Sequence, residues 1–297
     1  MTPTRPAAYR GRFAPSPTGP LHLGSLLAAL ASWLHARSAG GAWLLRIEDI
    51  DPPREQPGAS AAIIHSLEQH GLRQDGDILW QSRRSAAYDA ALALLEAGGH
   101  LFACTCSRRQ LDASGSCQRG CRNRQSPATG KPGALRVAVP PDFTSEWDDP
   151  WQGRQHWPLG QQLTDFIVRR KDGLYAYQLA VVVDDADQQI TDVVRGADLL
   201  DSTPRQHLLQ TLLGYPQPRY AHIPVLADSQ GQKLSKQNLA PALDDTAAPD
   251  NLRRALHYLG QPAPPAGVNS AAELLEFALR HWSPHSLSRG PSVTVGH

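Results

Sequence analysis

A histidine stands at the entrance to an apolar helical stretch near the N-terminus, directly after a turn rich in proline and glycine. The stretch, residues 12–30, reads RFAPSPTGPLHLGSLLAAL. A strand, a glycine-containing turn and a helix together present backbone N–H groups and a helix N-terminus to phosphate. Gly19 and Gly24 allow close approach to the backbone, and His22 can donate a hydrogen bond to phosphate oxygens. An ordinary loop before a capped helix has the same pattern and stays open as an alternative.

Two lysines three residues apart lie in a glycine- and glutamine-rich loop later in the chain. Lys233 and Lys236 belong to KLSKQN, which follows the apolar segment HIPVL. Such a loop can close over a triphosphate and keep positive charge on the phosphates as they separate. Lysine and serine also abound in surface loops, so this pattern alone is a weak indication.

All four cysteines fall between residues 104 and 121, as C-x-C followed by C-x₃-C. In a cytosolic protein, two close pairs favour a tetrahedral structural zinc over disulfides. Four thiolates leave no open coordination position, which disfavours a catalytic zinc. Four incidental thiols are the alternative. The predicted ligands are Cys104, Cys106, Cys117 and Cys121.

The segment around the cysteines is basic. Between residues 104 and 139, Asp112 is the single acid. This excess is either a surface that faces phosphate or a loop whose arginines face water. The basic residues are Arg108, Arg109, Arg119, Arg122, Arg124, Lys131 and Arg136.

Strands and helices that alternate through the first hundred residues must position these groups. Alternation of this kind predicts a mostly parallel sheet with crossover helices. We expect Ser25 to be the N-cap of the first helix. The expected strands are 9–14, 42–48, 77–82 and 100–105, and the expected helices are 25–38, 60–71 and 85–99.

The alternation breaks at Cys104 and resumes near residue 165. The intervening segment is rich in Arg, Gly, Pro and Ser and predicts an inserted subdomain. Two further helices are expected at 250–259 and 271–281, and a frayed tail from Ser283. The predicted division is 1–103 and 164–240 as two halves of one α/β domain, 104–163 as a zinc-binding insertion, and 241–297 as a short helical region.

Composition excludes several classes of protein. Apolar residues make up 41% of the 297 residues and charged residues 19%, which is typical of globular rather than disordered chains. No apolar run reaches the length of a membrane span, and the N-terminus lacks a signal-peptide core. We therefore expect a cytoplasmic protein. The net charge of +1 gives the whole molecule no general attraction to polyanions.

Taken together, APSPTGPLHLGS and KLSK resemble the two signatures of class I aminoacyl-tRNA synthetases, usually written HIGH and KMSKS. Flanking segments narrow the resemblance to the glutamyl/glutaminyl branch and cover residues 9–240. Three departures stand in the signatures, at Ser25, Leu234 and Gln237, and none removes a charged group. The resembling segments are RFAPSPTGPLHLG, LLRIEDIDPPR, DVVRGADLLDSTPRQ and HIPVLADSQGQKLSK.

This resemblance implies a Rossmann-type catalytic domain that makes an aminoacyl-adenylate from ATP with Mg²⁺ and passes the acyl group to RNA. It assigns phosphate binding and catalysis to His22, Lys233 and Lys236. The glutamate pocket it implies consists of Arg12, Phe13, Ala14, Pro15, Ser16, Glu48, Tyr177 and Arg195. The ATP site consists of Pro15, Thr18, Gly19, His22, Gly24, Ser25 and Lys236.

Length selects one member of the branch. Only about sixty residues follow Lys236, too few for the large anticodon-binding portion of the full synthetases. The chain resembles the glutamyl-Q tRNA(Asp) synthetases, which activate glutamate without tRNA and transfer it to the queuosine base of tRNA(Asp). The resemblance implies ATP, L-glutamate and queuosine-containing tRNA(Asp) as partners. We expect a monomer, and the basic insertion at residues 104–139 is the candidate contact with the tRNA.

Three alternatives remain open at this point. The chain could be a truncated glutamyl-tRNA synthetase that charges a tRNA 3′ end. It could be an adenylating ligase that acts on a small metabolite, although RIEDIDP and RGADLL argue against this. It could be a non-catalytic RNA-binding paralogue, but such proteins often lose the signature histidine or lysines, which are present here.

Overall fold

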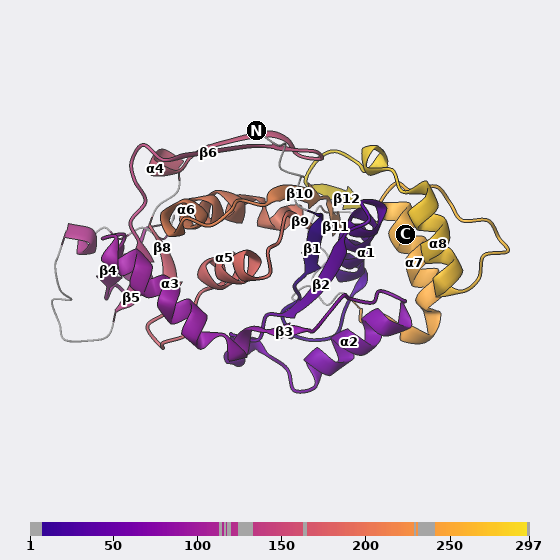
Figure 1. Cartoon of the computed structure of the whole chain (residues 1–297), viewed down its shortest axis with the longest axis horizontal. Helices are drawn as coiled ribbons and strands as arrows, with labels where there is room; N and C mark the ends of the chain where they lie inside the picture. The colour runs from indigo at the N-terminus through magenta and orange to yellow at the C-terminus, as the bar shows by residue number, and fades with distance from the viewer. Residues whose placement is uncertain are drawn as a thin grey trace, which may run out of the picture.

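A parallel sheet and the helix that crosses it form the centre of the fold (Figure 1). The computed structural model describes residues 8–112, 115, 117, 120–123, 133–162, 165–228, 230 and 241–295. One set of parallel strands has the order β1-β2-β3, and β9 and β10 form a second parallel pair. The strands are β1 (Arg10–Phe13), β2 (Ala42–Ile47), β3 (Leu79–Trp80), β9 (Asp192–Gly196) and β10 (Arg219–Ile223).

The two sets of strands meet where β1 lies against β9. The backbone N–H of Thr191 donates to the carbonyl of Arg10 at 2.9 Å, and the N–H of Arg10 donates to Thr191 Oγ1 at 2.8 Å. Because parallel strands run in the same direction, their carboxyl ends gather at one edge, which is where open α/β sheets bind ligands. The parallel arrangement expected from the sequence is confirmed.

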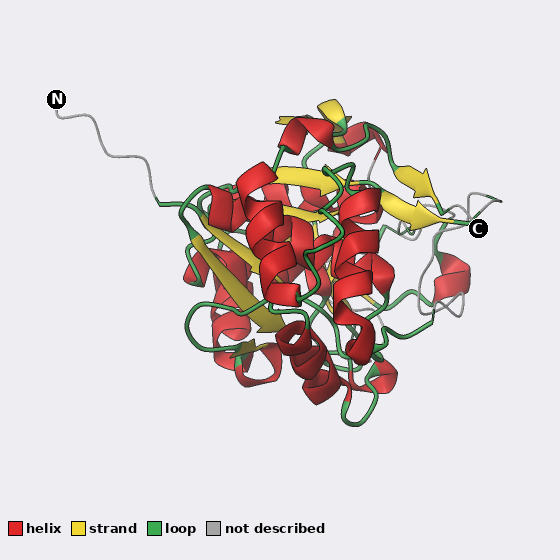
Figure 2. Ribbon diagram, turned by 90° about the vertical axis from the view of Figure 1, so that its right-hand side faces the viewer, coloured by secondary structure: helices red, strands yellow, loops and turns green. Residues whose placement is uncertain are grey.

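Helix α1 (Leu23–Ser38) is buried on several sides because apolar residues surround most of its circumference. One side packs on β1, β2 and β9, and the opposite side packs on α7 (Ala248–Tyr258) and α8 (Ala271–His281). Figure 2 views the molecule from the side of these two helices. They match the expected helices at 250–259 and 271–281. None of the helices in the described residues is long and apolar enough to cross a membrane.

A second group of elements packs around α5 and forms a buried cluster of its own. Its strands β4, β5 and β8 form an antiparallel sheet, whereas the sequence pattern predicts that β4 continues the parallel alternation. The described residues between β4 and β5 hold short 3-10 turns and no crossover helix, which antiparallel pairing does not require. The elements of this group are α3 (Ser85–Ala97), β4 (Leu101–Cys104), β5 (Ala134–Val137), β8 (Phe166–Arg169), α5 (Tyr177–Asp187) and α6 (Thr203–Leu213). Helix α2 (Ala59–Gln69) instead buries its apolar residues in the core around α1.

The later part of the predicted insertion forms a β-hairpin. Strands β6 (Thr144–Asp149) and β7 (Gly153–Pro158) pair antiparallel and lead into the short helix α4 (Leu159–Gln162). In Figure 1 the hairpin runs along the top of the molecule, and β6 packs on β10 and α6. The hairpin therefore lies against the parallel sheet. The division of the chain into 1–103, 104–163, 164–240 and 241–297 remains a prediction.

The C-terminal tail is ordered, which contradicts the expectation that it frays from Ser283. Strand β12 (Ser292–Thr294) pairs in parallel with β11 (Val225–Ala227), and Leu287 is 5% exposed. The indole Nε1 of Trp151 in the β6–β7 turn donates to the carbonyl of Pro284 at 2.8 Å. Partners distant in sequence supply this order, because the tail itself has a weak local pattern.

Candidate active site and cysteine cluster

A cavity of about 690 Å³ opens where β1 and β9 end and α1 begins. It brings together most of the residues that the sequence assigned to glutamate and ATP. Gly19 is not part of its lining but adopts a φ of 140°, which favours glycine in the turn before α1. Lys233 and Lys236 lie outside the described residues. The predicted residues that line the cavity are Arg12, Phe13, Ala14, Pro15, Ser16, Thr18, His22, Gly24, Ser25, Glu48, Tyr177 and Arg195.

His22 is the N-cap of α1, which corrects the prediction that Ser25 holds this position. The backbone N–H of Ser25 donates to His22 Nδ1 at 3.3 Å, so the ring acts as the acceptor that a serine hydroxyl usually supplies. Because Nδ1 accepts, the proton of the neutral ring belongs on Nε2. That nitrogen lies 3.1 Å from Ser25 Oγ at the cavity edge. The Nε2–H of His22 thus faces the Ser25 hydroxyl beside a positive helix end, and a phosphate bound there would compete with that hydroxyl for the donor.

Arg12 belongs to a buried ion pair as well as to the cavity lining. Its Nε and Nη2 donate to the two carboxylate oxygens of Asp185 on α5 at 3.0 and 3.3 Å. Nη2 of Arg46 on β2 donates to the same carboxylate at 2.6 Å. Burial alone raises the pKa of Asp185, but the charges of the two arginines outweigh it and hold that pKa below its usual range. The ion pair fixes one edge of the Arg12 guanidinium at the end of β1.

Glu48 places a buried carboxylate oxygen without a hydrogen-bond partner beside the cavity. The residue is 7% exposed, and its Oε1 has no partner among the described residues. Burial raises the pKa of this carboxyl from 4.5 to about 7, although the charges of Arg46 and Arg12 oppose the change. A buried acceptor of this kind costs free energy until a donor reaches it. A ligand with an ammonium group supplies both the donor and the charge.

Arg195 lines the cavity from β9, and all five of its N–H groups already have acceptors. Two of these acceptors line the cavity: the hydroxyl of Tyr177 at 3.3 Å and the carbonyl of Leu199 at 3.2 Å. The other three acceptors are His222 Nε2 at 3.0 Å, Gln206 Oε1 at 2.9 Å and Thr203 Oγ1 at 2.7 Å. A carboxylate that binds Arg195 must therefore replace the two longer bonds on the cavity side.

The sequence analysis did not assign some of the residues that line the cavity. Arg54, Asp198 and Leu199 line the cavity but were assigned no role, although they fall within the resembling segments LLRIEDIDPPR and DVVRGADLLDSTPRQ. Asp185 was also missed. The signal for it is two acids in the apolar run VVVDDA, because a carboxylate inside an apolar helix needs a buried partner.

Comparison with known proteins identifies the family. The sequence matches the family described as tRNA synthetases class I (E and Q), catalytic domain, over residues 8–259. A glutamyl-Q tRNA(Asp) synthetase from Pseudomonas entomophila (strain L48) is 50% identical over 96% of this chain and 96% of that protein. A protein of the same name from Xanthomonas campestris pv. campestris (strain 8004) is 52% identical over 96% of this chain and 95% of that protein. The chain belongs to the glutamyl-Q tRNA(Asp) synthetase family.

Solved structures of synthetases have the same fold. Glutamate-tRNA synthetase from Elizabethkingia anophelis gives a TM-score of 0.81 at 24% identity, covering 97% of this chain and 68% of that one. A glutamate tRNA ligase from Elizabethkingia meningosepticum CCUG26117 gives 0.80 at 25% identity, covering 96% and 66%. The expected class I synthetase fold is confirmed, and the chain is a ligase of the aminoacyl-tRNA synthetase type.

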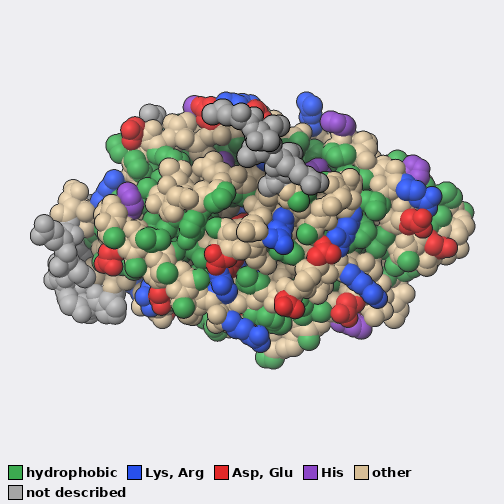
Figure 3. All heavy atoms as spheres, in the orientation of Figure 1, with side chains coloured by type: hydrophobic (Ala, Val, Ile, Leu, Met, Phe, Trp, Pro, Cys, Tyr) green, Lys and Arg blue, Asp and Glu red, His purple; other side chains and the backbone are tan. Residues whose placement is uncertain are grey.

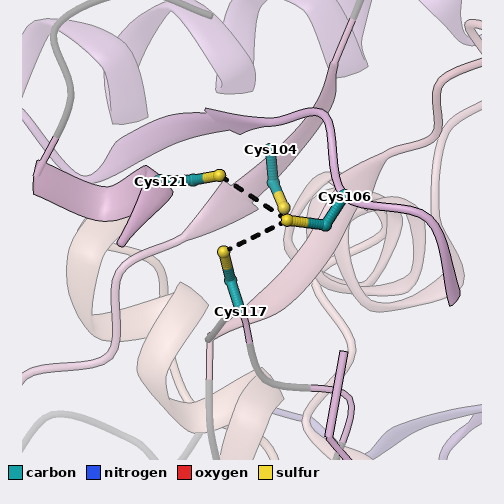
Figure 4. Close-up of side chains that lie close together, drawn as sticks. All are labelled: Cys104, Cys106, Cys117 and Cys121. Atoms are coloured by element: carbon teal, nitrogen blue, oxygen red, sulfur yellow. Dashed lines mark hydrogen bonds between the residues drawn. The ribbon is translucent and has the colours of Figure 1, made fainter. Parts of the chain in front are cut away.

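In this member of the glutamyl-Q tRNA(Asp) synthetase family, the four cysteines converge at the end of β4 (Figure 4). All four sulfur atoms lie within 4.8 Å of one another. Cys106 Sγ lies 3.5 Å from Cys117 Sγ and 3.7 Å from Cys121 Sγ. Zn–S bonds of about 2.3 Å in a tetrahedron place sulfurs roughly 3.8 Å apart, so the donor set fits zinc. Four incidental thiols would have no reason to meet in this way.

Without a cation, the surroundings of the cluster favour neutral thiols. Burial, followed by hydrogen bonding to Cys117, raises the pKa of the Cys106 thiol to about 12. Thiolates, the form that binds metal, are therefore unfavourable there unless a positive charge is present. The cluster is not part of the lining of the active-site cavity.

The basic segment around the cysteines does not form one uniform surface. Arg136 is buried and donates to the carbonyls of Gly115 and Asp165, at 2.9 and 2.8 Å, so it faces neither phosphate nor water. Arg122 is half exposed and pairs with the Asp165 carboxylate at 3.3 Å. Acidic and basic side chains are interspersed over the face of the molecule seen in Figure 3. Arg109 is exposed, the side chain of Arg108 is not described, and Arg119, Arg124 and Lys131 lie outside the described residues.

Proposed function

We propose that this protein activates L-glutamate with ATP to form glutamyl-adenylate without tRNA, and then transfers glutamate to the queuosine base in the anticodon loop of tRNA(Asp). The observation that carries the proposal is the match, end to end, with relatives of that name at 50% identity over 96% of both chains. The cavity supplies the chemistry that the first half-reaction needs.

The amino acid fits the polar groups of the cavity. Its ammonium group would donate to the unpaired Oε1 of Glu48. A carboxylate would bind Arg195 and replace the bonds to Tyr177 and Leu199, because arginine holds carboxylates through two parallel N–H groups. Glutamate carries both a carboxylate that reacts and a second one that can be recognised.

ATP would place its phosphates at the N-terminus of α1, beside His22 Nε2. The KLSK loop would bring Lys233 and Lys236 to the same phosphates, as the family resemblance implies. No side-chain nucleophile is needed, because the carboxylate of the amino acid attacks the α-phosphate directly and pyrophosphate leaves. Catalysis is then positioning and charge stabilisation. ATP would enter with Mg²⁺, which neutralises part of the phosphate charge.

The remaining assignments are part of the same proposal. We propose structural zinc at Cys104, Cys106, Cys117 and Cys121, and a cytoplasmic location, where thiols stay reduced. We also propose that the protein is a monomer. We keep the exposed part of the basic segment, including Arg109 and Arg122, as the candidate tRNA contact.

Two assays on the purified protein test the function. ATP–pyrophosphate exchange with glutamate and no tRNA should proceed, and glutamine should be a poor substrate. Labelled glutamate should then be transferred to queuosine-containing tRNA(Asp) and not to queuosine-free tRNA(Asp) or tRNA(Glu). Exchange that requires tRNA(Glu) would favour a truncated glutamyl-tRNA synthetase, and indifference to queuosine would refute the proposed acceptor.

A further inference from the structure

Three of the five hydrogen bonds of the Arg195 guanidinium lie on the side that faces away from the cavity. The acceptors are His222, Thr203 and Gln206, from β10 and α6, and they lie outside the cavity lining. They hold the guanidinium in one orientation, so the two remaining N–H groups point to acceptors that do line the cavity. The three acceptors outside the cavity thus fix the plane of the guanidinium.

The orientation of His222 is in turn set by Asp149 at the end of β6. Both side chains are 0% exposed, and His222 Nδ1 lies 2.6 Å from Asp149 Oδ2. The same oxygen accepts the backbone N–H of His222 at 3.0 Å. The other oxygen accepts the backbone N–H groups of Trp151 and Gln152 at 3.0 and 2.9 Å. The three backbone N–H groups donate whatever the state of His222. Burial raises the pKa of Asp149, but its hydrogen bonds outweigh burial and hold that pKa below the usual range, so the carboxylate stays ionised.

An ionised Asp149 fixes the tautomer of His222. A carboxylate can only accept, so Nδ1 carries the proton and Nε2 presents its lone pair. Nε2 then accepts from Arg195 Nε at 3.0 Å and lies 3.1 Å from Thr203 Oγ1, which itself accepts from Arg195 Nη2. Burial lowers the pKa of His222 to about 4, which keeps the ring neutral, although Asp149 opposes the change. With the proton on Nε2 instead, the Nε2–H of His222 and the Nε–H of Arg195 would face each other as two donors.

We propose that Asp149 and His222 are positioning residues for Arg195: they hold its guanidinium so that two N–H groups meet the substrate carboxylate in the cavity. This inference rests on the proposed function, since it gives Arg195 glutamate as ligand. Neither residue lines the cavity, so His222 acts on a bound substrate through Arg195, and Asp149 acts through His222. Specificity for the amino acid therefore depends on the β6–β7 hairpin, which comes from the inserted segment.

Three substitutions at His222 test the chain of contacts. His222→Gln keeps a carbonyl acceptor near the Nε2 position, whereas His222→Asn keeps a donor near Nδ1 and loses the acceptor for Arg195. His222→Leu loses both. We expect the KM for glutamate to rise about 10-fold to 100-fold in the Asn and Leu variants and much less in the Gln variant. The KM for ATP should stay within about 2-fold, because a loss of general stability would move both constants.

Asp149→Asn provides a second, independent variant. An amide facing Nδ1 favours the other tautomer, which puts a proton on Nε2 against Arg195, so this variant should show the same selective rise in the KM for glutamate. His257→Asn is the matched control, because His257 is an exposed histidine on α7. It should behave as the wild type in both constants and in melting temperature.

A structural readout separates this inference from the proposed function. The Arg195 Nε–H resonance in ¹⁵N NMR should be protected from exchange in the wild type, retained in His222→Gln and lost in His222→Asn. If folded His222→Asn keeps that resonance and the wild-type KM for glutamate, the inference is wrong. If the wild type shows no glutamate-dependent exchange at all, the proposed substrate is wrong, and the NMR comparison still decides whether His222 holds Arg195.

Discussion

The Arg12 Nε lies 3.0 Å from the Asp185 carboxylate, and both side chains are 4% exposed. The arginine at the front of the signature stretch is therefore both a cavity residue and half of a buried ion pair. These two roles agree, because a guanidinium that lines a substrate pocket must be held still and its charge balanced. The partner comes from α5, on a different part of the chain.

Asp185→Asn should destabilise the protein strongly. It leaves Arg12 and Arg46 buried without a counter-charge, and removal of one partner of a buried ion pair costs about 3–5 kcal/mol. Urea unfolding followed by circular dichroism measures the free energy of unfolding. Asp187→Asn on the same helix is the control: its partner is Arg84, its side chain is 51% exposed, and its loss should cost at most about 1 kcal/mol. Equal losses in the two variants would contradict the role of the buried pair.

Glu48 should make glutamate binding depend on pH. Its pKa is raised by burial from 4.5 to about 7, so the folded protein holds a proton between these values that the unfolded chain releases. Its contribution to folding stability is accordingly full below pH 4.5 and lost as the pH rises through 7. An ammonium group needs the ionised form, so the KM for glutamate should rise by up to about tenfold per pH unit as the pH falls below the folded pKa.

The measurement for Glu48 is the KM for glutamate in pyrophosphate exchange from about pH 8 to about pH 6. Glu48→Gln should bind glutamate weakly and with little dependence on pH, because the amide does not titrate. The KM for ATP serves as the internal control in both proteins. A flat profile for the wild-type enzyme would show that Glu48 does not receive the ammonium group.

The sequence predicted the cavity well because signature motifs are local. Arg12 through Ser25 form one continuous segment from the end of β1 to the first turn of α1, so a motif in the sequence is also a motif in space. What the sequence could not show is pairing over long distances. Asp185 meets Arg12 from 173 residues away, and His222 meets Asp149 from 73. Hydrophobic and helical patterns record which residues are buried, but a single sequence does not record which buried charges meet.

Two of the errors have different physical origins. Serine is a common N-cap residue, so the sequence favoured Ser25. The ring of His22 instead accepts a hydrogen bond from the backbone N–H of Ser25, and the helix therefore starts earlier. The C-terminal tail has no strong hydrophobic pattern in its sequence, yet β12 pairs in parallel with β11. The first error concerns a local capping bond, and the second concerns a tertiary pairing that the tail sequence alone does not specify.

Zinc should be present in one equivalent per chain and should support folding rather than activation of glutamate. Cys106→Ser removes the thiol that contacts two others in the cluster, so it should release the metal and lower the melting temperature. Elemental analysis and thermal unfolding measure these effects, and a chelator should reproduce them. At low temperature, pyrophosphate exchange should persist because the cluster lies outside the cavity lining. Wild-type protein without stoichiometric zinc would refute the assignment.

Lys236→Ala should slow activation of glutamate by orders of magnitude and leave the fold intact. The lysine is assigned to the charge that develops on the α-phosphate and the departing pyrophosphate, and loss of such a group affects the transition state more than the ground state. The rate of pyrophosphate exchange measures the effect, with circular dichroism as the check on folding. Pyrophosphate exchange by Lys236→Ala at close to the wild-type rate would contradict this role for Lys236.

The C-terminal tail should contribute to stability through Leu287. This side chain is 5% exposed and packs in the core that contains α1, α7 and α8, so Leu287→Ala removes buried apolar surface and leaves a cavity. We expect a loss of about 2–5 kcal/mol in the free energy of unfolding. Leu94→Ala is the matched control, because Leu94 is 57% exposed and its truncation should change stability by less than about 0.5 kcal/mol. If Leu287→Ala is as stable as Leu94→Ala, the tail is not held in the core by this residue.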